Sequence, residues 1–240
     1  MKICAIGNSH LAAIKKGWDQ IGNEFPHLEL IFFGAHATDL RYLQIQGDAL
    51  VPSHPHLREM MHRTSGGRDR IEGTFDLYLI VGCQLSFNRL VLGVMEKQGG
   101  ADGTGVLQKA LAVSLARSIR QISGAPILVL PGPYASGDDA EEAYEWNGSD
   151  SEMLTLKARY VTKLETLGRD AGFTPLLQPE RTIREEYFTK HKFAVGGVRL
   201  SGAGDESTFD GYHMNQKFGA IYLRHVFKKF ASATDQNSAS

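Results

Sequence analysis

The chain has 240 residues, of which 42% are hydrophobic, and this is enough for the core of one sizeable α/β domain. Its 26 lysines and arginines nearly balance 27 aspartates and glutamates, and neither sign forms a long run, which argues against nucleic acid or a membrane as a partner. No window approaches the roughly 20 apolar residues of a membrane helix, and the first residues lack a secretory signal pattern, so we expect a cytoplasmic location.

Short apolar runs alternate with longer helix-like stretches, which is typical of a parallel sheet with crossover helices. In chain order, strands are predicted at 2–6, 28–33, 77–81, 127–130 and 174–177. Helices are predicted at 10–21, 107–123, 152–171 and 214–230, the last because apolar residues recur at four-residue spacing. The pattern predicts one α/β domain over residues 1–231 and a disordered tail at 232–240.

Three longer stretches are predicted as loops that lie over a site: 35–73, 132–150 and 193–209. The glycine-rich segment 99–105 is predicted as a flexible turn, because it lacks the Gly-Lys-Ser/Thr of a phosphate-binding loop. Cys4 and Cys83 fall in or beside predicted strands and are expected to be buried, reduced thiols with a structural role.

The segment Gly7-Asn8-Ser9-His10 directly follows the first predicted strand. In an open parallel sheet, ligands bind beyond the carboxyl ends of the strands. A glycine there permits a tight turn, and a serine that opens the next helix lies at backbone N–H groups that favour a developing negative charge. Ser9 is therefore a candidate nucleophile, although Asn and Ser are also common helix caps with no further role.

The segment Asp210-Gly211-Tyr212-His213 precedes the last predicted helix, for which Asn215 is a candidate cap. A serine hydroxyl needs a base to take its proton, and an imidazole base needs a carboxylate to fix its tautomer. Asp210 and His213 can meet both needs. The alternative is that Asp210 only hydrogen-bonds its own loop and that His213 is a partly exposed surface residue.

Together, these two segments resemble the first and last blocks of the SGNH or GDSL hydrolase superfamily, which are Gly-Asp-Ser after a strand and Asp-x-x-His before the C-terminal helix. Two middle segments resemble its other blocks in part. Phe33-Gly34-Ala35 follows the second strand, and Gly82-Cys83-Gln84-Leu85 stands where the family usually has Gly-x-Asn-Asp. The chain departs from the family at Asn8, at His10 and at Gln84.

The resemblance implies a three-layer α/β/α sandwich with a flavodoxin-like, five-stranded parallel sheet in the order 2-1-3-4-5. It also implies that Ser9 attacks the substrate, that His213 accepts its proton and that Asp210 orients His213. The oxyanion would be held by the backbone N–H groups of Ser9 and Gly34 and by the side chain of Gln84. No metal and no organic cofactor is expected.

The reaction we expect is cleavage of an O-acetyl or other small carboxyl ester by a serine hydrolase, on a small molecule or a carbohydrate. Tyr134, Tyr144 and Trp146 are either a stacking surface for a sugar or part of the core. Acyl transfer through the same site is one alternative. Others are a catalytically silent binding protein of this fold and a doubly wound domain that binds a nucleotide or coenzyme. The oligomeric state is not indicated.

Three further residues are candidates for substrate binding: His10, Arg41 and Arg199. His10 stands beside Ser9, and the two arginines lie in loops expected at the rim of the site, where they could bind an anionic group. The histidines His54, His56 and His62 have a spacing that suits zinc, but no acidic or cysteine partner is near them in sequence, which favours a loop without metal.

Overall fold

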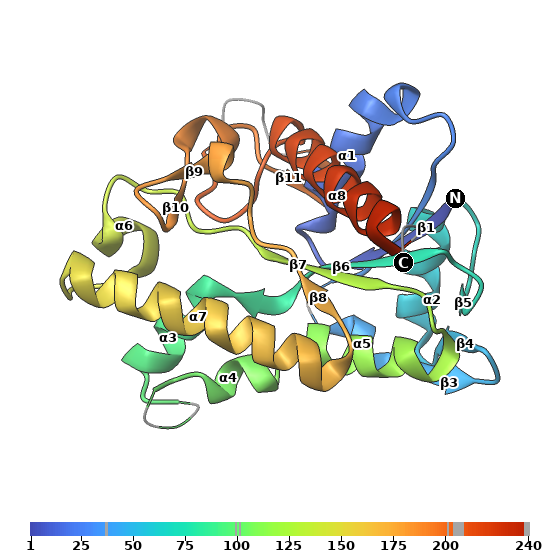
Figure 1. Cartoon of the computed structure of the whole chain (residues 1–240), viewed down its shortest axis with the longest axis horizontal. Helices are drawn as coiled ribbons and strands as arrows, with labels where there is room; N and C mark the ends of the chain where they lie inside the picture. Colours follow the sequence, from blue (N-terminus) through green and yellow to red (C-terminus); the bar gives the residue numbers. More distant parts are fainter. Residues whose placement is uncertain (37, 99, 101, 201, 204–208, 238–240) are drawn as a thin grey trace.

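A five-stranded parallel sheet forms the centre of the computed structural model, in the order β2-β1-β6-β7-β8 (Figure 1). The structure describes residues 1–36, 38–98, 100, 102–200, 202–203 and 209–237. The sheet strands are β1 (Lys2–Gly7), β2 (Glu29–Gly34), β6 (Leu77–Ser86), β7 (Ile127–Gly132) and β8 (Thr174–Pro175). The predicted strands and their 2-1-3-4-5 order are confirmed.

Helices cover both faces of this sheet, so the predicted three-layer sandwich is confirmed (Figure 1). In β1, Ile3 and Ala5 pack with α1 (Leu11–Ile21) and α8 (Gln216–Asn237), while Cys4 and Ile6 belong to the core on the other face. That second face is covered by α2 (Pro55–Ser65), α3 (Phe87–Met95), α5 (Leu111–Ile122) and α7 (Asp150–Ala171). Both faces are buried, which explains the nearly unbroken apolar runs of the strands.

Two glycines set the close packing of α1 against α8. A Cβ at Gly219 would collide with the carbonyl oxygen of Ala13, and a Cβ at Gly17 would collide with the backbone of Gly219 and Ala220. The two helix backbones therefore lie closer than any side chain would allow. Because α1 follows Ser9 and α8 follows His213, this contact also fixes the position of the Ser9 segment relative to the His213 segment.

The prediction of a loop over 35–73 is wrong, because this stretch holds a small three-stranded sheet and a helix. Its strands are β3 (Leu43–Gln46), β4 (Ala49–Pro52) and β5 (Ile71–Glu72), and α2 lies between β4 and β5. Gly47, at φ 62°, makes the β3–β4 turn. Pro55 opens α2, and Gly66 ends it in a left-handed conformation at φ 72°. Both are ordinary helix punctuation.

The helix α3, which sequence reasoning also missed, is capped by the Ser86 hydroxyl, which accepts the Arg89 N–H. The remaining short elements are α4 (Gly105–Gln108), α6 (Ala140–Tyr144), β9 (Ile183–Arg184), β10 (Phe188–Thr189), β11 (Val198–Arg199) and β12 (Gly202–Ala203) with the 3₁₀ turns η1 (Gly22–Glu24), η2 (Asp39–Tyr42), η3 (Glu180–Thr182) and η4 (His191–Phe193). Helix α6 falls within the predicted loop 132–150, and the hairpin of β11 and β12 falls within the predicted loop 193–209.

Helix α8 continues to Asn237, so most of the predicted tail 232–240 is helical, and residues 238–240 lie outside the described residues. In the predicted turn 99–105, residues 99 and 101 are also outside them. None of the described helices combines the length and the apolar character needed to cross a bilayer.

Candidate active site

Ser9 lies at the carboxyl end of β1, in the turn that leads into α1. The turn is tight, because the carbonyl of Asn8 accepts the Leu11 N–H at 2.9 Å and the carbonyl of Ser9 accepts the Ala12 N–H at 3.1 Å. Gly7 has no room for a side chain, since a Cβ there would lie 2.8 Å from the carbonyl oxygen of Val81. The sequence therefore folds to present Ser9 at the edge where ligands bind in parallel sheets.

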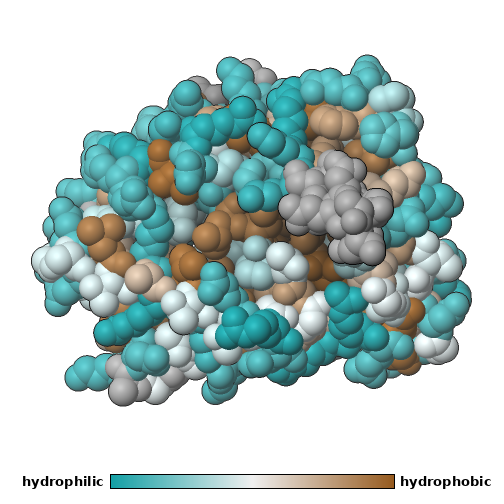
Figure 2. Space-filling view, in the orientation of Figure 1, coloured by the Kyte–Doolittle hydropathy of each residue, from teal (hydrophilic) through white to brown (hydrophobic). Residues whose placement is uncertain are grey.

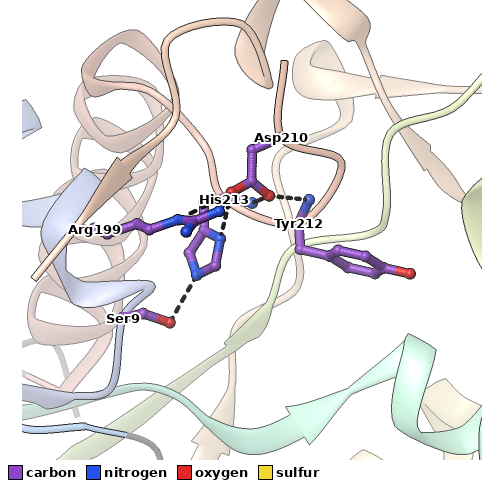
Figure 3. Close-up of polar contacts among 5 residues, drawn as sticks. All are labelled: Ser9, Arg199, Asp210, Tyr212 and His213. Carbon is purple, nitrogen blue, oxygen red and sulfur yellow. Dashed lines mark hydrogen bonds and ion pairs between the residues drawn. The ribbon is translucent and has the colours of Figure 1, made fainter. Parts of the chain in front are cut away.

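The structure brings Ser9, His213 and Asp210 together in one chain of hydrogen bonds (Figure 3). The Ser9 Oγ lies 2.9 Å from His213 Nε2, and His213 Nδ1 lies 2.9 Å from Asp210 Oδ2. The His213 side chain is 21% exposed and the Asp210 side chain 13%. An imidazole placed in this way can take the serine proton at one nitrogen while the carboxylate holds its other N–H.

Asp210 is held by its own loop as well as by His213. Its Oδ1 accepts the backbone N–H groups of Tyr212 at 3.0 Å and His213 at 3.1 Å, and its Oδ2 accepts the Arg199 Nε–H at 3.1 Å. Burial alone would raise the pKa of Asp210. The hydrogen bonds from Arg199 and Tyr212, together with the attraction to His213, hold this pKa well below its usual range instead.

His213 is anchored from the other side by Asn215, which caps α8 as predicted. The Asn215 Oδ1 accepts the N–H groups of Lys217 at 3.1 Å and Phe218 at 3.2 Å. Its Nδ2 donates to the carbonyl oxygens of Lys192 and Val195, both at 2.9 Å. The segment that carries His213 is therefore tied both to the helix after it and to the loop around η4.

His10 lies inside the site, next to His213, with ring centroids 5.5 Å apart. Its ring covers the ends of β6 and β7: a Cβ at Gly82 would lie 2.7 Å from His10 Cδ2, and a Cβ at Gly132 would lie 3.4 Å from His10 Nε2. His10 Nδ1 is buried and has no hydrogen-bond partner among the described residues. An imidazole in this setting is neutral, because burial, reinforced by repulsion from His213, lowers the pKa of His10 to about 4.

A change in the pH dependence of stability is expected when His10 is replaced by glutamine. Between pH 6.5 and pH 4 the unfolded chain holds a proton at this position that the folded chain lacks, so folded stability falls as the pH falls through this window. We expect His10→Gln to lose less stability between pH 7 and pH 4.5 than the native protein, by about 1 to 3 kcal/mol. Urea unfolding at the two pH values measures this.

The control is His54→Gln, which removes an exposed histidine that stacks on Tyr42 outside the site. The drop in stability of His54→Gln should match that of the native protein. An equal drop in His10→Gln and the native protein would contradict the neutral, buried state of His10.

The three expected oxyanion donors differ in how they are engaged. Among the described residues, the Ser9 backbone N–H has no acceptor. The Gly34 N–H donates to the Thr64 hydroxyl at 2.9 Å, so an oxyanion would have to compete with this bond. The Gln84 side chain is partly exposed and has no hydrogen bond to another described residue.

Gln84 belongs to a strained bulge at the end of β6. Gly82, Cys83 and Gln84 have φ values of 69°, 48° and 63°, and the register with β7 shifts between Val81 and Ser86. Two adjacent non-glycine residues in the left-handed region are costly, and such strain is concentrated at functional sites. The bulge turns Gln84 away from the regular path of the strand at the edge where Ser9 lies.

Cys83 is fully buried in the same bulge, and burial raises the pKa of the thiol to about 12. A thiol of this kind is not a nucleophile at neutral pH, which agrees with the structural role expected for it. Cys4 is buried too, and both cysteines are free.

The other candidates for substrate contact have partners within the protein. Tyr134 and Tyr144 are 4% and 3% exposed and pack against Phe87, so they are core residues and not a stacking surface for a sugar. Arg41 bonds to the Thr38 hydroxyl at 2.8 Å on η2. Arg199 is bonded to Asp210, a role for which the sequence carried no signal.

The described residues include no group of three or more His, Cys, Asp or Glu side chains that could hold a metal ion. Of the predicted loop histidines, His54 stacks on Tyr42 and His56 lies 3.9 Å from the Asp39 carboxylate. A broad groove runs between α7 and α8, where Figure 2 shows apolar side chains in a hollow. Its lining includes the aromatic candidate Tyr134 but none of the other predicted site residues.

Comparisons with known proteins found similarity of fold. One solved structure has a TM-score of 0.50 at 16% sequence identity, over 96% of this chain and 96% of the other. Another, from Streptococcus pneumonia and described provisionally as a platelet activating factor, has a TM-score of 0.41 at 13% identity, over 95% of this chain and 82% of the other. No family model and no curated protein matches the chain. At these identities the likeness shows the fold alone.

Proposed function

We propose that the protein is a serine hydrolase that cleaves a small carboxyl ester, such as an O-acetyl ester. The observation that carries the proposal is the continuous set of hydrogen bonds from Ser9 Oγ through His213 to Asp210, at the carboxyl edge of a parallel sheet. The order of these residues and their positions at the two ends of the domain support the resemblance to the SGNH hydrolases.

In the proposed reaction, the Ser9 Oγ forms a bond to the ester carbonyl carbon while its proton passes to His213 Nε2. Asp210 accepts the His213 Nδ1–H and stabilises the imidazolium that forms. The tetrahedral intermediate then collapses as His213 gives the proton to the leaving alkoxide oxygen. The alcohol departs, and the acyl group remains bound to Ser9 as an ester. Water, activated by the same histidine, then releases the acid and restores Ser9.

The negative charge on the carbonyl oxygen would be stabilised by the Ser9 N–H and by the Gln84 amide. Gly34 can contribute only when its N–H leaves Thr64. Acyl transfer in place of hydrolysis has less support, because Tyr134 and Tyr144, two of the three aromatic residues expected to hold a sugar, are buried in the core.

Covalent labelling tests the proposal. A fluorophosphonate probe at neutral pH is expected to add one phosphonyl group to the native protein, which peptide mapping should locate at Ser9. Ser53 is the matched position, since it is an exposed serine whose hydroxyl donates to the Tyr42 carbonyl, and it should stay unmodified. Absence of labelling in folded protein, or labelling that persists in His213→Ala, would overturn the assignment and favour a silent binding protein.

Opposite effects on stability and activity are expected for Gln84→Gly. Glycine adopts a φ of 63° without strain, so the free energy of unfolding should rise by about 0.5 to 1 kcal/mol. The oxyanion donor is lost, so turnover should fall by about 10² to 10³-fold. Thermal unfolding and acetyl-ester kinetics measure the two effects.

Gln84→Ala separates the two contributions, because it removes the same donor and keeps a Cβ at a strained φ. It should lose activity like Gln84→Gly without the gain in stability. Full activity in both variants would exclude Gln84 from the oxyanion hole.

A further inference from the structure

Arg199 lies in β11, on the hairpin that β11 and β12 form beside the Asp210–His213 pair. Its strand β11 is tied to the His213 segment, because the Val198 N–H donates to the Met214 carbonyl at 3.2 Å. The next residue, Leu200, packs over the end of β2, where a Cβ at Gly34 would lie 3.0 Å from it. The position of Arg199 is therefore fixed on one side by the segment that carries His213 and on the other by the end of β2.

The Arg199 guanidinium binds the same carboxylate oxygen that His213 uses. Its Nε–H reaches Asp210 Oδ2 at 3.1 Å, and a second bond runs from Nη2 to that oxygen (Figure 3). The Arg199 side chain is 57% exposed and the Asp210 side chain 13%, so the arginine covers the carboxylate on its solvent side. Oδ2 thus has a fixed place between a permanent cation and the imidazole.

We propose that Arg199 is a positioning residue that acts through Asp210: it holds the carboxylate ionised and in place, and its charge opposes protonation of the neighbouring His213 imidazole. A cation beside the pair disfavours a second positive charge on the imidazole, while Asp210 stays charged to orient it. This inference rests on the proposed hydrolase function, and it concerns how the activity of the same site depends on pH in acidic solution.

The other groups around the pair do not supply this charge. His10 is neutral at its position, and the Tyr212 phenol carries no charge because burial, followed by the Glu145 and Asp210 carboxylates, raises its pKa. Arg199 is thus the cation that contacts the Asp210–His213 pair among the described residues.

The test compares Arg199→Gln, Arg199→Lys and the native protein between pH 5 and pH 9. The rate of fluorophosphonate labelling of Ser9 and acetyl-ester turnover are measured as functions of pH. In Arg199→Gln the acidic limb of both profiles should move to higher pH by about half a unit to one unit, given the solvent exposure of the guanidinium. Arg199→Lys, which keeps the charge, should bring the limb back toward that of the native protein.

Arg224→Gln is the matched control, because Arg224 also donates from Nε and Nη2 to a carboxylate, that of Glu24, outside the site, and its profile should overlay the native one. A fall in rate by the same factor at every pH in Arg199→Gln would mean a purely structural role and overturn the inference, as would an unchanged profile.

A readout without catalysis keeps this inference separate from the proposed function. The titration of the His213 imidazole is followed by NMR in the native protein and in Arg199→Gln. A move of this titration to higher pH in the variant supports the role of Arg199 even if Ser9 is never labelled, in which case the hydrolase proposal alone fails. Identical titrations would overturn the role of Arg199 even if Ser9 is reactive.

Discussion

Replacing Ser9 with alanine is expected to lower the turnover of a small acetyl ester by about 10⁴-fold or more, with the protein still folded. The Ser9 hydroxyl bonds to His213 Nε2, whereas the contacts that shape the turn come from the Ser9 backbone and survive the change. Steady-state kinetics on an acetyl ester, with circular dichroism to verify the fold, measures the effect.

A double variant makes this test sharper. If Ser9 and His213 act as one unit, Ser9→Ala/His213→Ala should be no slower than Ser9→Ala alone, because the base has nothing left to activate. Ser53→Ala should turn over like the native protein. Turnover by Ser9→Ala within about tenfold of the native rate would place the nucleophile elsewhere.

Replacing Gly219 with alanine is expected to destabilise the fold by about 3 kcal/mol or more, which corresponds to a fall in Tm of roughly 6 to 12 °C for a chain of this size. The new methyl group would collide with the backbone carbonyl of Ala13, and backbone atoms cannot turn aside as side chains do. The helices α1 and α8 would have to separate. Differential scanning calorimetry gives the change in Tm.

Gly124→Ala is the control for this change, because a Cβ at Gly124 meets no atom within 4 Å. Its Tm should stay within about 2 °C of the native value. In the folded fraction of Gly219→Ala, labelling of Ser9 should also be slower, since α1 and α8 set the distance between Ser9 and His213. An unchanged Tm would mean that the two helices do not approach as closely as described.

Four strands of the central sheet, β1, β2, β6 and β7, could be predicted from the sequence because each carries an unbroken apolar run. In Leu77–Val81, for example, successive side chains enter opposite cores, so both faces need apolar residues. The helix α2 could not be found in the same way, because its exposed face carries His and Arg residues that resemble a polar loop. Pro55 at its start and Gly66 at its end are typical of helix boundaries, and they indicate the helix better than its polar residues do.

The approach of Ser9 to His213 could be expected because the segments that carry them resemble, in order and position, the first and last blocks of a known family. The surroundings of the pair could not be expected in this way. The bond from Arg199 to Asp210 depends on a short hairpin that has no periodic sequence pattern. The bond from Gly34 to Thr64 depends on where α2 lies. Contacts between loops follow from the packed fold and not from local spacing.

The packing of α1 on α8 has a consequence for the way the chain reaches its native state. Helix α8 is synthesised long after α1, so the apolar face of α1 that packs on α8 stays uncovered while the residues between the two helices are made. The hydrogen bond of Ser9 to His213 likewise cannot form until His213, 204 positions further along the chain, has been made. A growing chain would therefore carry the proposed nucleophile before the proposed base, and the pair would form only when α8 docks on α1.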